Sequence, residues 1–255
     1  MKFGICGTPD NASKVKESGY DYIELALNQM SCLSDTDFNC VVEILKAAGI
    51  QSLAMNGFFP YDLKIVGNSV NKIEIEKYIE KALSRASRLG AETVVFGSGK
   101  SRAVPEGESR EKCIFQLYDC IYRAGMIAKN YGINIVIEPL NSSETNVINT
   151  VTDGAQFVDC ISLDNVKTMV DFFHYTQMDE PDNDLMTACS HIGHVHIARG
   201  TSDRGVPNAS DTDYLKHIGE LLKNINYNNS VSVEAVYTDF NREAEEIINL
   251  MKMYF

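Results

Sequence analysis

Short apolar runs typical of β-strands alternate with amphipathic helical stretches along this whole chain. The strand-like runs cover residues 3–6, 20–25, 51–55, 93–96, 134–138, 166–171, 193–197 and 230–234. The helical stretches between them include residues 41–48, 75–89, 111–129, 214–224 and 242–253. The first two of these end before Gly49 and Gly90, and glycine is a common helix stop. This alternation predicts parallel strands joined by right-handed helical crossovers.

Eight strand–helix units are the number that closes a parallel sheet into a (β/α)8 TIM barrel. The chain has 255 residues, which matches the roughly 250 residues typical of such a barrel. No linker rich in proline, glycine or serine and no low-complexity tract divides the chain. We therefore predict an α/β fold in which residues 1–255 form a single-domain barrel, with its active site at the carboxyl ends of the strands.

The composition is that of a globular protein, with 44% hydrophobic and 23% charged residues. No apolar run approaches the roughly 20 residues of a membrane-spanning helix, and the first residues lead into a strand without a secretory signal. We therefore expect a cytoplasmic protein that does not bind membranes. The formal net charge of −12 and the lack of a basic cluster argue against a nucleic-acid partner, because phosphate would be repelled.

Four strand-like runs in the second half of the chain each have, at or next to their last position, a residue that could bind a metal ion. These residues are Glu138, Asp171, His196 and Glu234. Each one alone could merely mark the point where a strand gives way to a solvated loop. Burial of a carboxylate is costly unless a partner or a metal compensates it. Because the carboxyl ends of barrel strands meet at one mouth, we expect the four side chains to converge there.

Three carboxylates and one imidazole form a hard, oxygen-rich set of ligands. Such a set favours manganese or magnesium, with cobalt or zinc also compatible, and it differs from a closed structural zinc site. We predict one divalent cation, with manganese preferred, and open coordination positions. A cation of this kind could polarise a carbonyl or hydroxyl oxygen of a bound small molecule.

Short motifs at the ends of the last four predicted strands resemble the xylose isomerase-like barrels, and among them the single-metal ketose 3-epimerases and related sugar isomerases. The match spans nearly the whole chain. The motifs are Ile137-Glu138-Pro139-Leu140-Asn141 with Glu144-Thr145, Val170-Asp171-Phe172-Phe173-His174, Gly193-His194-Val195-His196-Ile197 and Ser232-Val233-Glu234. Two-metal aldose isomerases of the wider group carry a lysine after the Glu-Pro pair. This chain has Leu140 there, which favours the single-metal branch.

The resemblance implies roles for individual residues. The four strand-end residues would bind one divalent cation, and Glu138 and Glu234 would also exchange protons with the substrate. Glu144 and His174 would contact hydroxyl groups of a sugar or sugar phosphate. Related barrels commonly pair or form tetramers, so we also expect a homodimer or a homotetramer.

The substrate-binding arginine of that family cannot be carried over directly. It stands six positions after the metal-binding histidine, and Ser202 occupies this position here. Arg199 and Arg204 lie on either side of Ser202. We take Arg204 as the candidate for contact with the substrate.

Two glutamates that flank a substrate suit epimerisation, because a proton beside a carbonyl must leave one face and return on the other. A metal that chelates the carbonyl oxygen and the neighbouring hydroxyl would stabilise the cis-enediolate. We therefore expect a metal-dependent sugar isomerase or epimerase that acts on a ketose or a related hydroxy-carbonyl compound. Two alternatives remain open: an inosose-type polyol dehydratase, which would expel hydroxide after the same proton abstraction, and a non-catalytic sugar-binding or partner subunit.

Four further residues or segments carry weaker expectations. Glu24 closes the second predicted strand and points either to the mouth or to a hydrogen bond in the core. His194 lies on the same strand face as His196, one layer deeper, and is expected either in the core or in contact with a metal ligand. His174 is expected in the loop that leaves its strand. The run 97–101, Gly-Ser-Gly-Lys-Ser, lacks the first glycine of a phosphate-binding loop, so its glycines are expected to let this loop pass close to the barrel mouth.

Overall fold

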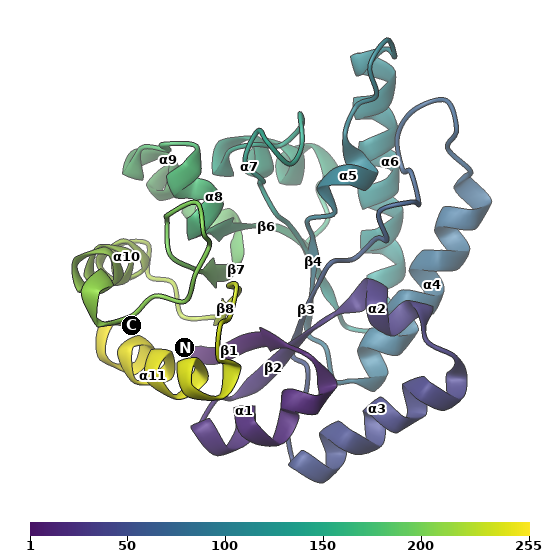
Figure 1. Ribbon diagram of the computed structural model, residues 1–255. Helices are drawn as coiled ribbons and strands as arrows, with labels where there is room; N and C mark the ends of the chain where they lie inside the picture. The colour runs from purple at the N-terminus through teal and green to yellow at the C-terminus, as the bar shows by residue number, and fades with distance from the viewer.

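Eight parallel strands form a closed barrel, in sequence order, in the computed structural model, which describes residues 1–255. The strands are β1 (Lys2–Gly7), β2 (Tyr22–Ala26), β3 (Ala54–Asn56), β4 (Thr93–Phe96), β5 (Asn134–Ile137), β6 (Val166–Asp171), β7 (Ile192–Ile197) and β8 (Ser230–Val233). Strand β8 pairs with β1 and closes the ring, so the purple and yellow ends of the chain lie side by side in Figure 1. The prediction of a single-domain (β/α)8 TIM barrel is confirmed.

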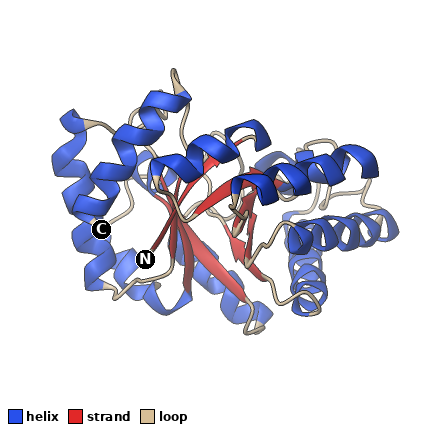
Figure 2. Cartoon of the chain, turned by 90° about the horizontal axis from the view of Figure 1, so that it is seen from below, coloured by secondary structure: helices blue, strands red, loops and turns tan.

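Helices surround the strands on the outside of the barrel (Figures 1 and 2). The α-helices are α1 (Ala12–Ser18), α2 (Leu27–Cys32), α3 (Asp35–Ala48), α4 (Lys72–Arg88), α5 (Gly99–Arg102), α6 (Arg110–Lys129), α7 (Val151–Ile161), α8 (Phe172–Gln177), α9 (Asp182–Thr187), α10 (Thr212–Asn224) and α11 (Phe240–Tyr254). Three short 3-10 helices are η1 (Pro9–Asn11), η2 (Cys189–His191) and η3 (Ala209–Asp211). No helix has the length and the apolar character that crossing a membrane requires.

Polar caps explain where the helices begin, and they account for the largest differences from the sequence prediction. Helix α3 starts six residues before the predicted position, because the Ser34 side chain accepts a hydrogen bond from the Asp37 amide. Helix α7, which the apolar pattern did not indicate, begins at a capping box formed by Thr150 and Asp153. The predicted stop at Gly49 is correct, and this glycine adopts a left-handed conformation.

One side of the barrel interior is apolar. Side chains alternate along a strand between the interior and the helix-facing side. Val136 and Met169 stand two positions before Glu138 and Asp171, and so lie one layer beneath them inside the barrel. Together with Val95 they form a small buried cluster that is separate from the main hydrophobic core between strands and helices.

The other side of the interior is polar. Its buried side chains are Tyr22, Glu24, His194 and Ser232, from strands β2, β7 and β8. The Tyr22 hydroxyl and the Ser232 hydroxyl are 2.7 Å apart. Gly4 on the neighbouring strand makes room for this layer, because a Cβ atom there would lie 2.2 Å from the Tyr22 ring. The barrel is therefore filled by two chemically different halves beneath a single mouth.

Candidate metal centre and active site

The structure brings the four predicted metal ligands together at the carboxyl ends of β5 to β8. One donor atom from each of Glu138, Asp171, His196 and Glu234 lies within 4.8 Å of the others. His196 Nδ1 is 3.6 Å from Glu138 Oε1, 3.9 Å from Asp171 Oδ2 and 3.1 Å from Glu234 Oε2. Glu138 and Glu234 each follow directly after the last residue of a strand, because β5 and β8 end one residue earlier than the sequence predicted.

A cation would satisfy two buried polar atoms of this donor set. Glu138 Oε1 and His196 Nδ1 are buried and have no hydrogen-bond partner. Unpartnered buried polar atoms are costly, and a set of oxygen atoms around one imidazole nitrogen repels itself unless positive charge lies between them. One divalent cation held by these four residues fits this arrangement, since three oxygen ligands and one nitrogen ligand suit manganese, magnesium, cobalt or zinc.

The charges at this centre shift the acid–base properties of its members in different directions. Burial lowers the pKa of His196, but the negative charges of Glu24 and Glu234 outweigh it and raise the pKa well above its ordinary value. Burial raises the pKa of Glu138. Burial also acts on Glu234, but His196 and Arg204 outweigh it and hold its pKa well below the ordinary value. The protein without metal therefore keeps positive charge among the carboxylates.

Of the two candidate arginines, Arg204 reaches the centre. Its Nη2 lies 2.6 Å from Asp171 Oδ2 and also contacts the carboxylate of Glu234. The guanidinium lies over the Phe173 ring, 4.8 Å from the centroid. Arg199 instead pairs with two aspartates of its own loop, Asp203 and Asp211.

His174 points an unpartnered nitrogen into the site. It lies on the short helix α8 and not in a loop, which corrects the sequence prediction. Its Nδ1 accepts hydrogen bonds from the Asn141 backbone N–H at 3.3 Å and from the Asn141 side-chain amide at 2.9 Å. A backbone N–H can only donate, so the ring proton is on Nε2. That Nε2 is buried without a partner, and is available to donate to a ligand oxygen.

A small cavity connects these groups. Its volume is about 160 Å³, and the Glu144 side chain, 44% exposed, stands at its open side. The residues that line the cavity are Asn28, Gly57, Phe59, Tyr61, Ser98, Gly99, Glu138, Leu140, Glu144, His174, Arg204 and Glu234. All three predicted substrate contacts therefore face the same space as the two glutamates predicted to exchange protons.

The sequence belongs to a known group of barrels. Residues 12–254 match the family described as Xylose isomerase-like TIM barrel. The chain belongs to this family. The resemblance inferred from the motifs is thereby confirmed.

Individual relatives of this xylose isomerase-like barrel are named as epimerases and isomerases. D-psicose 3-epimerase from Agrobacterium fabrum is 28% identical over 226 residues, which cover 87% of this chain and 76% of that protein. Inosose isomerase from Halalkalibacterium halodurans is 25% identical over 265 residues, with 96% and 91% covered. The solved D-psicose 3-epimerase with D-tagatose from Clostridium cellulolyticum H10 has the same fold, with a TM-score of 0.84, 22% identity, and 100% and 99% covered. The family and the named relatives support an isomerase.

Asn56 and Arg102 hold Glu234 and Glu138 in place in this xylose isomerase-like barrel. The sequence analysis did not assign either residue to the site. The Asn56 side chain, at the end of β3, donates to Glu234 Oε1 at 2.7 Å. Its strand-end position is the signal that could have revealed it. Arg102 is wholly buried and donates to the carbonyls of Phe96 at 3.0 Å, Glu138 at 2.7 Å and Ile148 at 3.3 Å.

The glycines after β4 and the aromatic turn after β3 also shape the cavity. A Cβ atom on Gly97 would lie 2.1 Å from Glu138 Oε2, so only glycine leaves space for this carboxylate. The expected close approach of the loop to the barrel mouth is thus present. Phe58 and Phe59 are fully buried, and pack on Phe96 with centroid distances of 5.9 and 5.4 Å.

The polar interior layer lies directly beneath these ligands. Glu24 forms hydrogen bonds in the core and does not reach the cavity, and His194 is buried beside it. Burial raises the pKa of Glu24, but His196 and His194 outweigh it and lower the pKa to about 2. Glu24 is therefore a carboxylate at neutral pH.

Proposed function

We propose that this chain is a divalent-metal-dependent sugar epimerase or isomerase that acts on a ketose or a related hydroxy-carbonyl compound. The observation that carries this proposal is the convergence of three carboxylates and one imidazole on a point at the edge of one small cavity. The relatives named as D-psicose 3-epimerases support the same class of substrate, because D-psicose is a ketose. We further propose that the bound cation is manganese, because the ligand set is rich in oxygen.

The two glutamates are suited to move a proton across the substrate. They rise from β5 and β8, which are separated by β6 and β7 in the ring, so they approach the cavity from different sides. In the proposed reaction one of them takes the proton from the carbon beside the carbonyl, and the other returns a proton to the opposite face. When bound, the divalent cation would supply electrophilic polarisation of the carbonyl and the neighbouring hydroxyl oxygen.

The remaining cavity residues would orient the sugar. The Nε2–H of His174 is a free donor for a hydroxyl or carbonyl oxygen, and Arg204 supplies positive charge beside Asp171 and Glu234. Glu144 is an acceptor for a sugar hydroxyl at the open side. A cavity of about 160 Å³ suits a single small sugar and not a chain of sugars.

Two measurements test the proposal. Metal analysis of the purified protein should find one divalent ion per chain, and incubation with a panel of ketoses in deuterated water should introduce deuterium at the carbon beside the carbonyl.

A pair of variants tests the two glutamates. Glu138→Gln and Glu234→Gln should each remain folded but lose turnover, because the general acid–base groups are removed. Glu106→Gln, in an exposed turn, is the matched control. A Glu138→Gln or Glu234→Gln variant with a near-normal rate refutes the assignment.

A second candidate function is dehydration of a cyclic polyol. The relative named inosose isomerase matches nearly the whole chain and supports the substrate of this candidate, although its name is that of an isomerase. The same proton abstraction followed by loss of hydroxide would give a product lighter by one water. Mass analysis of the products separates the two reactions. If neither product forms while sugars still bind, the chain is a non-catalytic sugar-binding subunit.

A further inference from the structure

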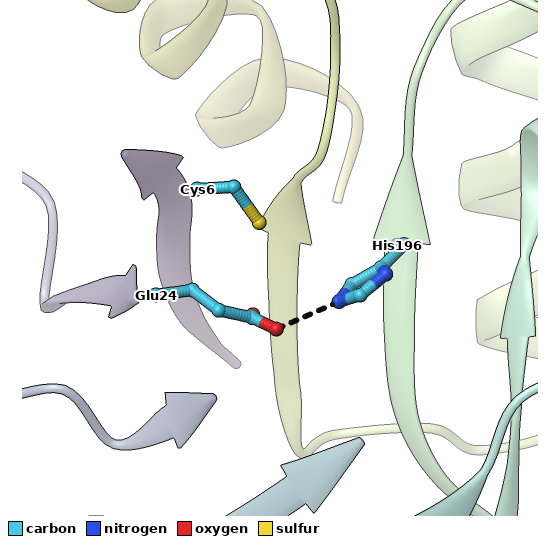
Figure 3. Close-up of side chains that lie close together, drawn as sticks. All are labelled: Cys6, Glu24 and His196. Carbon is cyan, nitrogen blue, oxygen red and sulfur yellow. Dashed lines mark hydrogen bonds and ion pairs between the residues drawn. The ribbon is translucent and has the colours of Figure 1, made fainter. Parts of the chain in front are cut away.

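Glu24 bridges two histidines inside the barrel, beneath the metal centre. His196 Nε2 lies 3.0 Å from Glu24 Oε1, and His194 Nε2 lies 3.1 Å from Glu24 Oε2. All three side chains are fully buried. Figure 3 shows Glu24 and His196 pointing toward one another from separate strands.

The chemistry of a carboxylate decides which nitrogen of each ring carries the proton. The two histidines and the Ser232 hydroxyl converge on the two oxygens of Glu24, and a carboxylate only accepts, so each histidine donates from Nε2. Metal binding displaces any further proton from His196, so the proton that remains is the one on Nε2, and Nδ1 then presents a lone pair. That lone pair faces Glu138, Asp171 and Glu234, which is the direction in which a metal ligand must point.

The position of Glu24 does not depend on His196. Its Oε2 also accepts from the Ser232 hydroxyl, and His194 is held in turn by a 2.8 Å contact between its Nδ1 and the Ser230 hydroxyl. Two groups other than His196, the His194 ring and the Ser232 hydroxyl, therefore hold the carboxylate before any metal binds. Rigid support of this kind is what lets a hydrogen-bond partner orient a metal-binding histidine.

A second metal site is the competing explanation of the same cluster. Cys6, Glu24 and His196 also offer donor atoms within 4.8 Å of one another (Figure 3). However, both oxygens of Glu24 already accept hydrogen bonds. Cys6 Sγ accepts one from Asn56 at 3.4 Å. None of these donor atoms is left unpartnered, in contrast to Nδ1 on the other side of the His196 ring.

We propose that Glu24 is a positioning residue of the metal centre, which keeps the proton of His196 on Nε2 and directs Nδ1 toward the cation. The inference rests on the proposed metal-dependent function, because it requires a cation held by His196 and the three carboxylates. Glu24 itself touches neither the cation nor the substrate. Its contribution is to select in advance which of the two histidine nitrogens faces the cation.

The direct test needs no mutation. In zinc-loaded protein labelled with ¹⁵N-histidine, NMR should show His196 bound through Nδ1, with a slowly exchanging proton on Nε2. Coordination through Nε2 would overturn the proposal. If the protein binds no divalent cation, both this proposal and the proposed function fail. If it binds the cation as described but turns over no sugar, only the proposed function fails.

A matched pair of variants measures the effect on affinity. Glutamine in Glu24→Gln presents one acceptor and one donor in place of two acceptors, so the two histidines can no longer both donate to it. Calorimetric titration of metal-stripped protein with Mn²⁺ should give an affinity about 10- to 100-fold weaker than wild type. Glu180→Gln is the control, because Glu180 is a half-buried glutamate that accepts a backbone N–H from Val151 away from the barrel interior. Its affinity should equal that of wild type. Equal affinity of Glu24→Gln and wild type would overturn the proposal.

Discussion

The two halves of the barrel interior lie at the same depth but support the metal ligands above them in different ways. Beneath Glu138 and Asp171, the interior is filled by Val95, Val136 and Met169. Beneath His196, it is filled by hydrogen-bonded polar groups centred on Glu24. The comparison indicates that a carboxylate, whose two oxygens are chemically alike, can stand on an apolar layer. An imidazole has two different nitrogens and needs a partner that selects one of them.

This difference carries an energetic condition. An apolar layer needs only to fill its space, whereas a buried polar layer is stable only if every donor and acceptor is paired. The polar half meets this condition, because none of Tyr22, Glu24, His194 and Ser232 has an unpartnered buried atom. The two halves should therefore respond differently to mutation.

The largest effect on stability is expected in the apolar half. Met169→Ala should lower the free energy of unfolding by about 2–5 kcal/mol, because it leaves a cavity in a buried cluster. The Mn²⁺ affinity of the folded protein should not change, since no hydrogen bond to a ligand is lost. Urea unfolding and calorimetric titration provide the two measurements. A loss of affinity comparable to that of a ligand mutant would show that the apolar layer also orients the ligands.

The position of Glu138, a metal ligand above the apolar half, should be sensitive to the size of the neighbouring residue 97. Gly97→Ala places a Cβ atom where Glu138 Oε2 now lies, and the carboxylate must move by about the size of a methyl group. A displacement of this order costs roughly 100-fold in kcat/KM. Steady-state kinetics with the best ketose substrate measure the loss, and an unfolding curve checks that the barrel is intact. Unchanged kcat/KM would mean that Glu138 tolerates displacement.

His196, the metal ligand above the polar half, should make the affinity for the metal depend on pH. Glu24 and Glu234 raise the pKa of His196 above its ordinary value despite burial, so at neutral pH the metal-free histidine keeps an additional proton that the cation must displace. Mn²⁺ affinity should therefore fall as the pH is lowered, by at most about tenfold per pH unit for one proton. Calorimetry in buffers of different ionisation enthalpy counts the released proton. No proton release would contradict the expectation.

The smallest effect is expected when the support of His174 in the cavity is weakened. Asn141→Ala removes the shorter of the two hydrogen bonds to His174 Nδ1 and leaves the backbone N–H. Loss of one such hydrogen bond is worth about 1 kcal/mol, so KM for the sugar should rise severalfold. Mn²⁺ affinity should stay at the wild-type value. A weaker affinity for the metal would show that the position of His174 also affects the metal ligands.

The order of elements along the chain was sufficient to predict the barrel and the convergence of the four ligands. Strands β4 and β6 match the predicted ranges, because each is a short apolar run with clear ends. The partner of His196 could not be predicted, because Glu24 lies 172 positions away in sequence. Their contact depends on how the strands are staggered around the ring.

Loop geometry was also beyond the sequence. Arg204 reaches the site from a left-handed backbone conformation with φ of 46°, and the Val236 N–H holds the Arg204 carbonyl at 2.8 Å. Neither feature has a signature in the residue pattern, so Arg199 and Arg204 were equivalent by position. Helix α8 has only six residues, which is too short for an apolar periodicity to distinguish it from a loop.

The buried guanidinium of Arg102 has a consequence for engineering this barrel. It ties together the end of β4, the end of β5 and the segment that follows β5 through three main-chain carbonyls. If the segment after β4 or the segment after β5 were exchanged alone for that of another sugar enzyme, the buried guanidinium would lose hydrogen-bond partners. Attempts to change substrate preference should therefore exchange residues 97–102 and 138–148 together, from the same donor protein.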